Sequence, residues 1–179
     1  RFMAEDIAED IFLLNLMRIF GIGVITAYAL IATIGQIKRF SSAKKLVSYF
    51  GLAPRRKESG EGDRPVRKKP KGKADIRALL IECAHTALKH NTSSLKKWAL
   101  RLVFRKGQPM EGPHKDGRGK KIATVAVARK IVTAVWYHLN GLSCTMADAT
   151  ENLKGKLLKL AGHIGKDRVR AAGYPTYKE

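Results

Sequence analysis

A serine surrounded by cations is the residue of this sequence with the clearest capacity for chemistry. Ser59 precedes a glycine in a segment, residues 54–73, that carries nine lysines and arginines and almost no apolar side chains. A serine hydroxyl can attack a DNA phosphodiester when a base removes its proton and cations neutralise the charge that grows on the phosphate. Arginine suits this role because its planar guanidinium binds two phosphate oxygens at once. The candidate phosphate ligands in this segment are Arg55, Arg56 and Lys57.

A solvated serine in a basic loop is the simpler interpretation, and the local sequence by itself favours it. The nearby acids Glu58, Glu61 and Asp63 lie among the nine cations and show no ligand spacing for a metal ion. Cys83 and Cys144 show no such spacing either. We therefore expect no metal site and no cofactor within this chain.

The charge balance predicts a polyanionic partner. Lysine and arginine number 35 against 15 aspartates and glutamates, a net charge of +20, which is far beyond what solubility requires. Cations that neutralise phosphates release counterions and bind nucleic acid strongly. No segment approaches the roughly 20 uninterrupted apolar residues of a spanning helix, so we expect nucleic acid, DNA first, and no membrane partner.

Two glycines separate the first two helical patterns. Apolar residues recur at helical spacing over residues 5–18, and an apolar, alanine-rich run follows over residues 24–34 and stops at Gly35. Gly21 and Gly23 between them predict a helix-hairpin-helix element, in which the backbone and a helix N-terminus approach a phosphate. A plain turn between two helices is equally compatible with these residues. Contacts of this kind carry no base specificity.

Helical patterns continue to the end of the chain. Ser41 or Ser42 can cap a third helix, which Gly51 ends, and Asp75 can cap a fourth helix where it begins. The remaining helices are expected over residues 93–104, 120–139 and 152–160, with basic or glycine-rich loops at 54–73 and 107–119. The predicted fold class is all-α: a compact helical domain with a helix-hairpin-helix element and long basic loops.

Cations beside these helical runs extend the candidate interface. Two basic edges would line a groove for a nucleic-acid backbone, although each edge alone is equally typical of a solvated helix face. The first edge comprises Lys71, Lys73 and Arg77, and the second Lys120, Lys121, Arg129 and Lys130.

An ordered series of short motifs resembles the carboxy-terminal transposase domain of the insertion-sequence 110 family. The series includes Tyr49-Phe50-Gly51-Leu52-Ala53-Pro54 and Ser59-Gly60. Further matching segments are residues 22–27, 34–35, 39–46, 71–72, 76–80, 121–123 and 125–130, so the likeness spans about residues 19–139. The chain departs from the family in having Glu58 and Glu61 beside the serine, where their charges oppose an approaching phosphate.

The resemblance implies a DNA recombinase that moves an insertion sequence and is guided by a structured RNA. In such proteins an amino-terminal RuvC-like domain binds metal, and the carboxy-terminal domain supplies a serine nucleophile. By position Ser59 matches that serine. The RuvC-like domain is missing from this chain, so Mg is expected only together with that domain. The resemblance also implies a homo-oligomer at full length and a bacterial or archaeal, cytoplasmic and nucleoid-associated location. The alternative is a non-catalytic helix-hairpin-helix module that only binds nucleic acid.

The same observations suggest a division of the chain. We expect residues 1–18 to be the end of a helix from a longer protein, residues 19–140 to form the transposase domain and residues 141–179 to form a basic extension.

Overall fold

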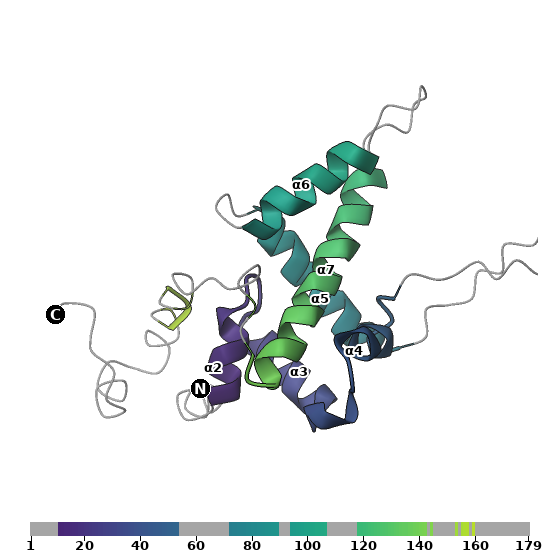
Figure 1. Ribbon diagram of the computed structural model, residues 1–179. Coiled ribbons are helices and arrows are strands. Elements are labelled where there is room, and N and C mark those ends of the chain that lie inside the picture. The colour runs from purple at the N-terminus through teal and green to yellow at the C-terminus, as the bar shows by residue number, and fades with distance from the viewer. Residues whose placement is uncertain are drawn as a thin grey trace, which may run out of the picture.

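The computed structural model describes residues 11–53, 72–89, 94–106 and 118–142, together with residues 144, 153, 155–157 and 159. Within these residues the chain is helical and contains no strand (Figure 1). The all-α prediction is confirmed for this part of the chain. The elements are α2 (Ile11–Arg18), α3 (Val24–Ile34), the 3-10 helix η1 (Ile37–Arg39), α4 (Ala43–Tyr49), α5 (Ala74–Lys89), α6 (Ser94–Lys106) and α7 (Arg118–Leu139).

Most predicted helices begin and end within a residue or two of their expected bounds. Helix α3 ends where Gly35 was expected to stop it, and the described residues near the chain end, 153, 155–157 and 159, are helical as predicted. Ser42 occupies the position before α4, but its side chain makes no capping hydrogen bond. Asp75 was wrongly predicted as a cap, because α5 starts one residue earlier and places Asp75 inside its first turn. There its carboxylate still favours the positive end of the helix dipole.

Glycine ends α4 through a specific backbone arrangement. Gly51 has a φ of 70°, and its amide donates to Ser48 while the amide of Leu52 donates to Val47. This pair of hydrogen bonds is the Schellman motif, which needs a residue in the left-handed conformation. The motif turns the chain sharply at Leu52 and so fixes where the following segment leaves the helix bundle.

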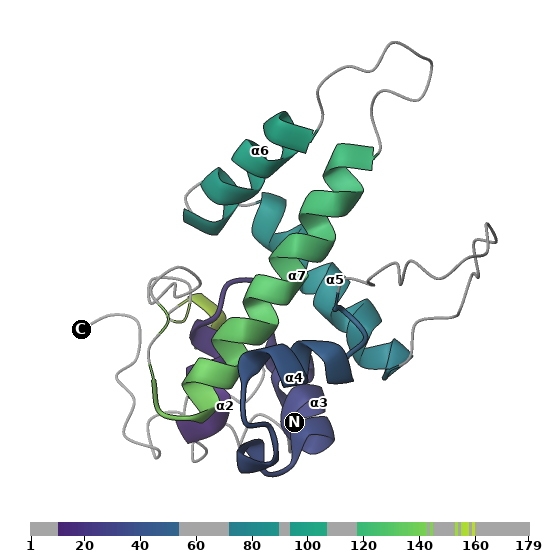
Figure 2. The ribbon, with the colours of Figure 1, turned by 45° about the vertical axis from the view of Figure 1, so that its right-hand side comes forward.

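Helix α7 is the central element of the bundle. It packs against α2, α4, α5 and α6, and both views show it running through the middle of the helical body (Figures 1 and 2). Small and β-branched residues let four neighbours approach one helix closely. The fully buried positions are Ala123, Val127, Ala128, Ile131, Val132, Ala134 and Val135.

By length and composition, α7 alone among the described helices could cross a membrane, over Gly119–Leu139. Arg129 and Lys130 interrupt this stretch, so it is not the uninterrupted apolar run that was expected to be absent. Half of this stretch is buried inside the bundle, because its apolar faces are covered by the neighbouring helices. Its apolar character is therefore that of a core helix.

A side chain of α7 and an arginine of η1 hold the segment between α3 and α4 in place. The indole nitrogen of Trp136 donates to the carbonyl of Phe40 at 2.9 Å. The guanidinium of Arg39 lies over the rings of Phe40 and Tyr49, 4.6 and 4.9 Å from their centroids. Such cation–π contacts hold an otherwise exposed arginine in place. The result is a rigid connection from α3 through η1 to α4.

Two isoleucines of α7 test its role as the core helix. Ile131 is fully buried and Ile122 is 42% exposed. We expect Ile131→Ala to lower the free energy of unfolding by about 2–5 kcal/mol through the cavity it leaves. Ile122→Ala should cost less than about 1 kcal/mol, because little apolar surface is lost and alanine favours the helix. Urea denaturation followed by circular dichroism measures both, and equal losses would contradict this packing.

Candidate nucleic-acid interface

The predicted nucleophile and its nearest cations lie outside the described residues. These are Ser59, Arg55, Arg56, Lys57 and Lys71. Their roles stay predictions. The structure does describe both ends of the segment that carries them, and these ends show how that segment is held.

The two ends of the segment meet at the last turn of α4. Gly72 has a φ of 127°, and a Cβ atom there would lie 2.7 Å from the amide nitrogen of Gly51 and 2.8 Å from the carbonyl oxygen of Tyr49. Only glycine fits so close to another backbone. We call this contact of residues 49–51 with Gly72 the loop base. The chain from residue 54 to residue 71 therefore leaves and rejoins the bundle at one place.

One predicted arginine contacts the loop base, and a second lies on the first turn of the helix that follows it. The Nε of Arg129 on α7 donates to the carbonyl oxygen of Leu52. Arg77 follows Gly72 by little more than one turn of α5, and its Nη1 atom is buried without a hydrogen-bond partner among the described residues. Lys73 is exposed beside them. A buried guanidinium nitrogen without an acceptor is costly, and because this nitrogen is closed off from solvent it can meet an anionic oxygen only if the Arg77 side chain moves.

The other predicted cations of α7 do not join this cluster. A helix turns about 100° per residue, so Lys120 and Arg129, nine residues apart, point to opposite sides of the helix, as do Lys121 and Lys130. Arg129 faces the loop base, whereas the Nζ of Lys130 lies 5.5 Å from the ring centroid of Trp98 on α6. The four cations therefore surround α7 and do not line a single groove.

The two hairpin glycines have different surroundings. Gly21 has a φ of 85°, and a Cβ atom there would clash with the carbonyl oxygen of Cys83 on α5. Gly23 precedes α3 in an extended conformation and is exposed, and a Cβ atom there would meet no other atom within 4 Å. Gly21 thus permits helix packing, and Gly23 leaves the first amides of α3 accessible to a ligand.

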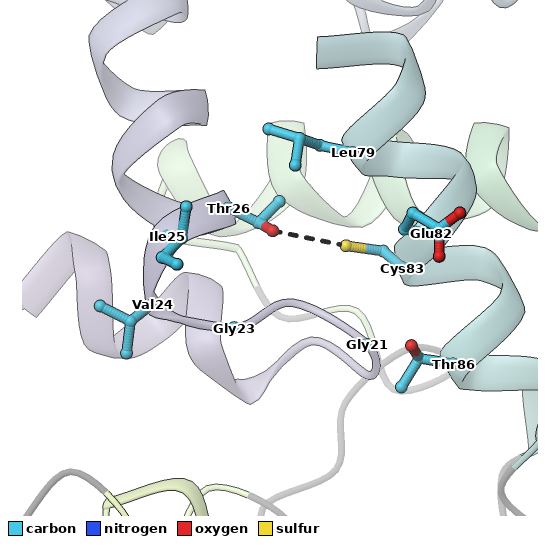
Figure 3. Close-up of a pocket in the computed structure, with 9 residues that line it drawn as sticks. All are labelled: Gly21, Gly23, Val24, Ile25, Thr26, Leu79, Glu82, Cys83 and Thr86. Atoms are coloured by element: carbon cyan, nitrogen blue, oxygen red, sulfur yellow. Dashed lines mark hydrogen bonds between the residues drawn. The ribbon is translucent and has the colours of Figure 1, made fainter. Parts of the chain in front are cut away.

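A shallow pocket of about 390 Å³ lies between the hairpin and α5 (Figure 3). On its wall the thiol of Cys83 donates to the hydroxyl of Thr26 at 3.8 Å. Burial raises the pKa of the Cys83 thiol, so the group stays neutral at physiological pH. The pocket also contains the carboxylate of Glu82, which repels phosphate. Gly23 and Val24 also line this pocket, so Glu82 disfavours a phosphate on this side of the hairpin.

The contacts of one lysine near the end of the chain were not predicted from the sequence. The Nζ of Lys156 donates to the carbonyl oxygens of Met17, Ile19 and Ile22 at the hairpin. No local pattern marks this lysine, because its partners lie more than 130 residues away. Within the part of the chain that the structure describes, no three His, Cys, Asp or Glu side chains gather as metal ligands.

Comparison with known proteins gives a consistent set of similarities. Residues 14–99 match the family model described as Transposase IS116/IS110/IS902 family. The transposase for insertion sequence element IS1111A of Coxiella burnetii is 29% identical over 119 residues, which are 65% of this chain and 29% of that protein. A putative transposase, y4rJ, of Sinorhizobium fredii is 34% identical over 107 residues, 59% of this chain and 25% of the relative.

A probable family 20 transposase of Pseudomonas aeruginosa is 26% identical over 133 residues, 73% of this chain and 36% of the relative. The aligned part thus spans between a quarter and just over a third of these relatives. No solved structure matches the chain.

The hairpin glycines provide a matched pair of variants. We expect Gly21→Ala to lower the free energy of unfolding by about 2 kcal/mol or more, because it adds left-handed strain and a clash with the backbone of α5. Gly23→Ala should change it by less than about 1 kcal/mol, since nothing opposes its Cβ. Urea denaturation of both variants checks this, and an equal effect would show that Gly21 does not set the packing of the hairpin.

Proposed function

Because residues 14–99 form a transposase domain of the IS116/IS110/IS902 family, we propose that this chain binds DNA and takes part in the transposition of an insertion sequence. In this proposal the segment 54–71 supplies Ser59 as the nucleophile. The loop base positions that segment, and Gly23 with the first turn of α3 holds the DNA backbone.

The observation that carries the proposal is the guanidinium group of Arg129 at the loop base, with a second guanidinium, that of Arg77, on the first turn of α5. Arg129 is fixed by its hydrogen bond to Leu52, and Arg77 has a buried nitrogen without an acceptor within the described residues. They belong to α7 and α5 respectively. An anion held here would lie beside the segment that carries Ser59. Phosphate is the anion that planar guanidinium groups bind best.

The proposed reaction is an exchange of one phosphoester for another. The Ser59 oxygen loses its proton to a general base and bonds to phosphorus, and the bond from phosphorus to the deoxyribose oxygen breaks. The leaving oxygen takes up a proton, and the DNA end stays joined to Ser59 as a phosphoserine. Cations of the segment and the loop base stabilise the charge of the transition state and outweigh the repulsion from Glu58 and Glu61.

The remaining components come from outside the matched part in this proposal. The aligned residues make up 36% or less of each relative named above, and we assign the RuvC-like domain with its Mg, the guide RNA and oligomer formation to the full-length protein. The relatives are bacterial, so we place the reaction on the bacterial nucleoid.

Covalent trapping tests the assignment of Ser59. A full-length protein carrying this domain is incubated with its RNA and labelled donor and target DNA, and protein–DNA adducts are separated under denaturing conditions. Ser59→Ala should abolish the adduct and recombination while DNA binding persists. Ser48→Ala, which changes an exposed serine of α4, should keep both. An adduct that survives in Ser59→Ala would refute the nucleophile, and a chain that binds DNA without forming any adduct would support the alternative of a non-catalytic binding module.

Salt dependence tests the binding surface of this chain. Affinity for duplex DNA should fall by about 10³-fold or more between roughly 50 and 200 mM salt if six or more phosphates are contacted. Lys73→Ala, at the loop base, should reduce the slope of log affinity against log salt by about 1. Lys97→Ala, an exposed lysine of α6, should leave the slope unchanged. A flat dependence of the unmodified chain would contradict a phosphate-based interface.

A further inference from the structure

Three backbone carbonyls converge on one point at the hairpin between α2 and α3. The oxygens of Met17, Ile19 and Ile22 lie 2.7, 3.1 and 2.7 Å from the Nζ of Lys156. All three belong to six consecutive residues, at the C-terminal end of α2 and in the turn that follows. We call this group the carbonyl ring.

The carbonyl ring has the chemistry of a site for a monovalent cation. Carbonyl oxygens at the end of a helix carry negative partial charge and need partners. A lysine ammonium has three N–H donors and no acceptor, so one ammonium can satisfy all three oxygens. Rings of backbone carbonyls also bind potassium, as in channel selectivity filters. The ring therefore recognises a compact cation and excludes an anion.

Burial of Lys156 disfavours its ammonium form but does not remove the charge at neutral pH. The lysine is half-buried, and burial lowers its pKa to about 8, an effect that nearby Cys83 opposes. At neutral pH the amine is still protonated and therefore positively charged. Residue 153 of the same segment packs against the hydrophobic core, which brings the lysine to the hairpin from the far end of the chain.

We propose that the carbonyl ring is a monovalent-cation site whose occupant is the ammonium group of Lys156, and that potassium takes this place when the lysine is removed. Lys156 acts as a tethered cation that fixes the shape of the hairpin and makes this shape independent of the salt present. The same contact attaches the C-terminal segment to the N-terminal helices. This inference concerns the hairpin alone and does not depend on the nucleophile.

Lys156→Ala tests the site because it removes the ammonium and leaves room for an ion. The melting temperature of the full chain is measured in potassium chloride and in N-methyl-D-glucamine chloride at equal ionic strength, the organic cation being too large for the ring. We expect Lys156→Ala to melt about 5 °C or more lower in the organic salt than in potassium, with a saturable response to potassium. The unmodified chain and Lys97→Ala should melt at nearly the same temperature in both salts.

Two outcomes would overturn the proposal. One is a Lys156→Ala variant that has the same melting temperature in both salts or is unfolded in both. The other is an unmodified chain that responds to potassium as strongly as the variant, since its ring would then not be occupied by the lysine.

Hydrogen exchange with a second variant tests the tethered cation separately. Lys156→Met keeps an apolar stem of similar length for packing but cannot donate to the carbonyl ring. Backbone amides of residues 19–24 should exchange at least about tenfold faster than in the unmodified chain, and Lys97→Met should not change them. Unaltered exchange in Lys156→Met would show that the ammonium does not hold the hairpin.

Discussion

Helix α7 can be buried only if four other helices cover it, and the arrangement of α2, α4, α5 and α6 follows from this constraint. Its buried apolar residues occupy about half of its circumference, as Ala123, Ala128 and Val132 illustrate. An apolar face of this width has to be covered by other parts of the protein. In this chain the neighbouring helices provide the cover.

The loop base is a consequence of this packing. Helices α4 and α5 both lie on α7, so the end of one and the start of the other come together. The Schellman motif at Gly51 and the close approach of Gly72 then join the two ends of the cationic segment. Arg129 extends from the core helix to this point, and so the element that organises the fold also positions a charge for the proposed phosphate site.

The hairpin is held from two directions. On one side Gly21 lies against the backbone of Cys83, and on the other Lys156 donates to three of its carbonyl oxygens. With both contacts in place, the exposed Gly23 and the first turn of α3 are presented on a fixed backbone. A fixed backbone loses little conformational entropy on binding a phosphate.

The sequence by itself determined the helices and the charge of this protein. The bounds of α3 and α7 followed from apolar periodicity and glycine stops, which depend on residues close together in the chain, and the excess of cations is a property of composition. Gly21 and Gly23 were identified as one pair, yet their different roles could not be distinguished without α5. Only the tertiary structure decided which cations lie together. Arg129 contacts the loop base, while Lys120 points to the opposite side of α7, because the direction of a side chain depends on the rotation of its helix against the neighbours. Lys156 was invisible in the sequence for the same reason. Its partners are backbone oxygens more than 130 residues away, and the pattern of side chains near Lys156 does not predict which distant backbone atoms it will meet.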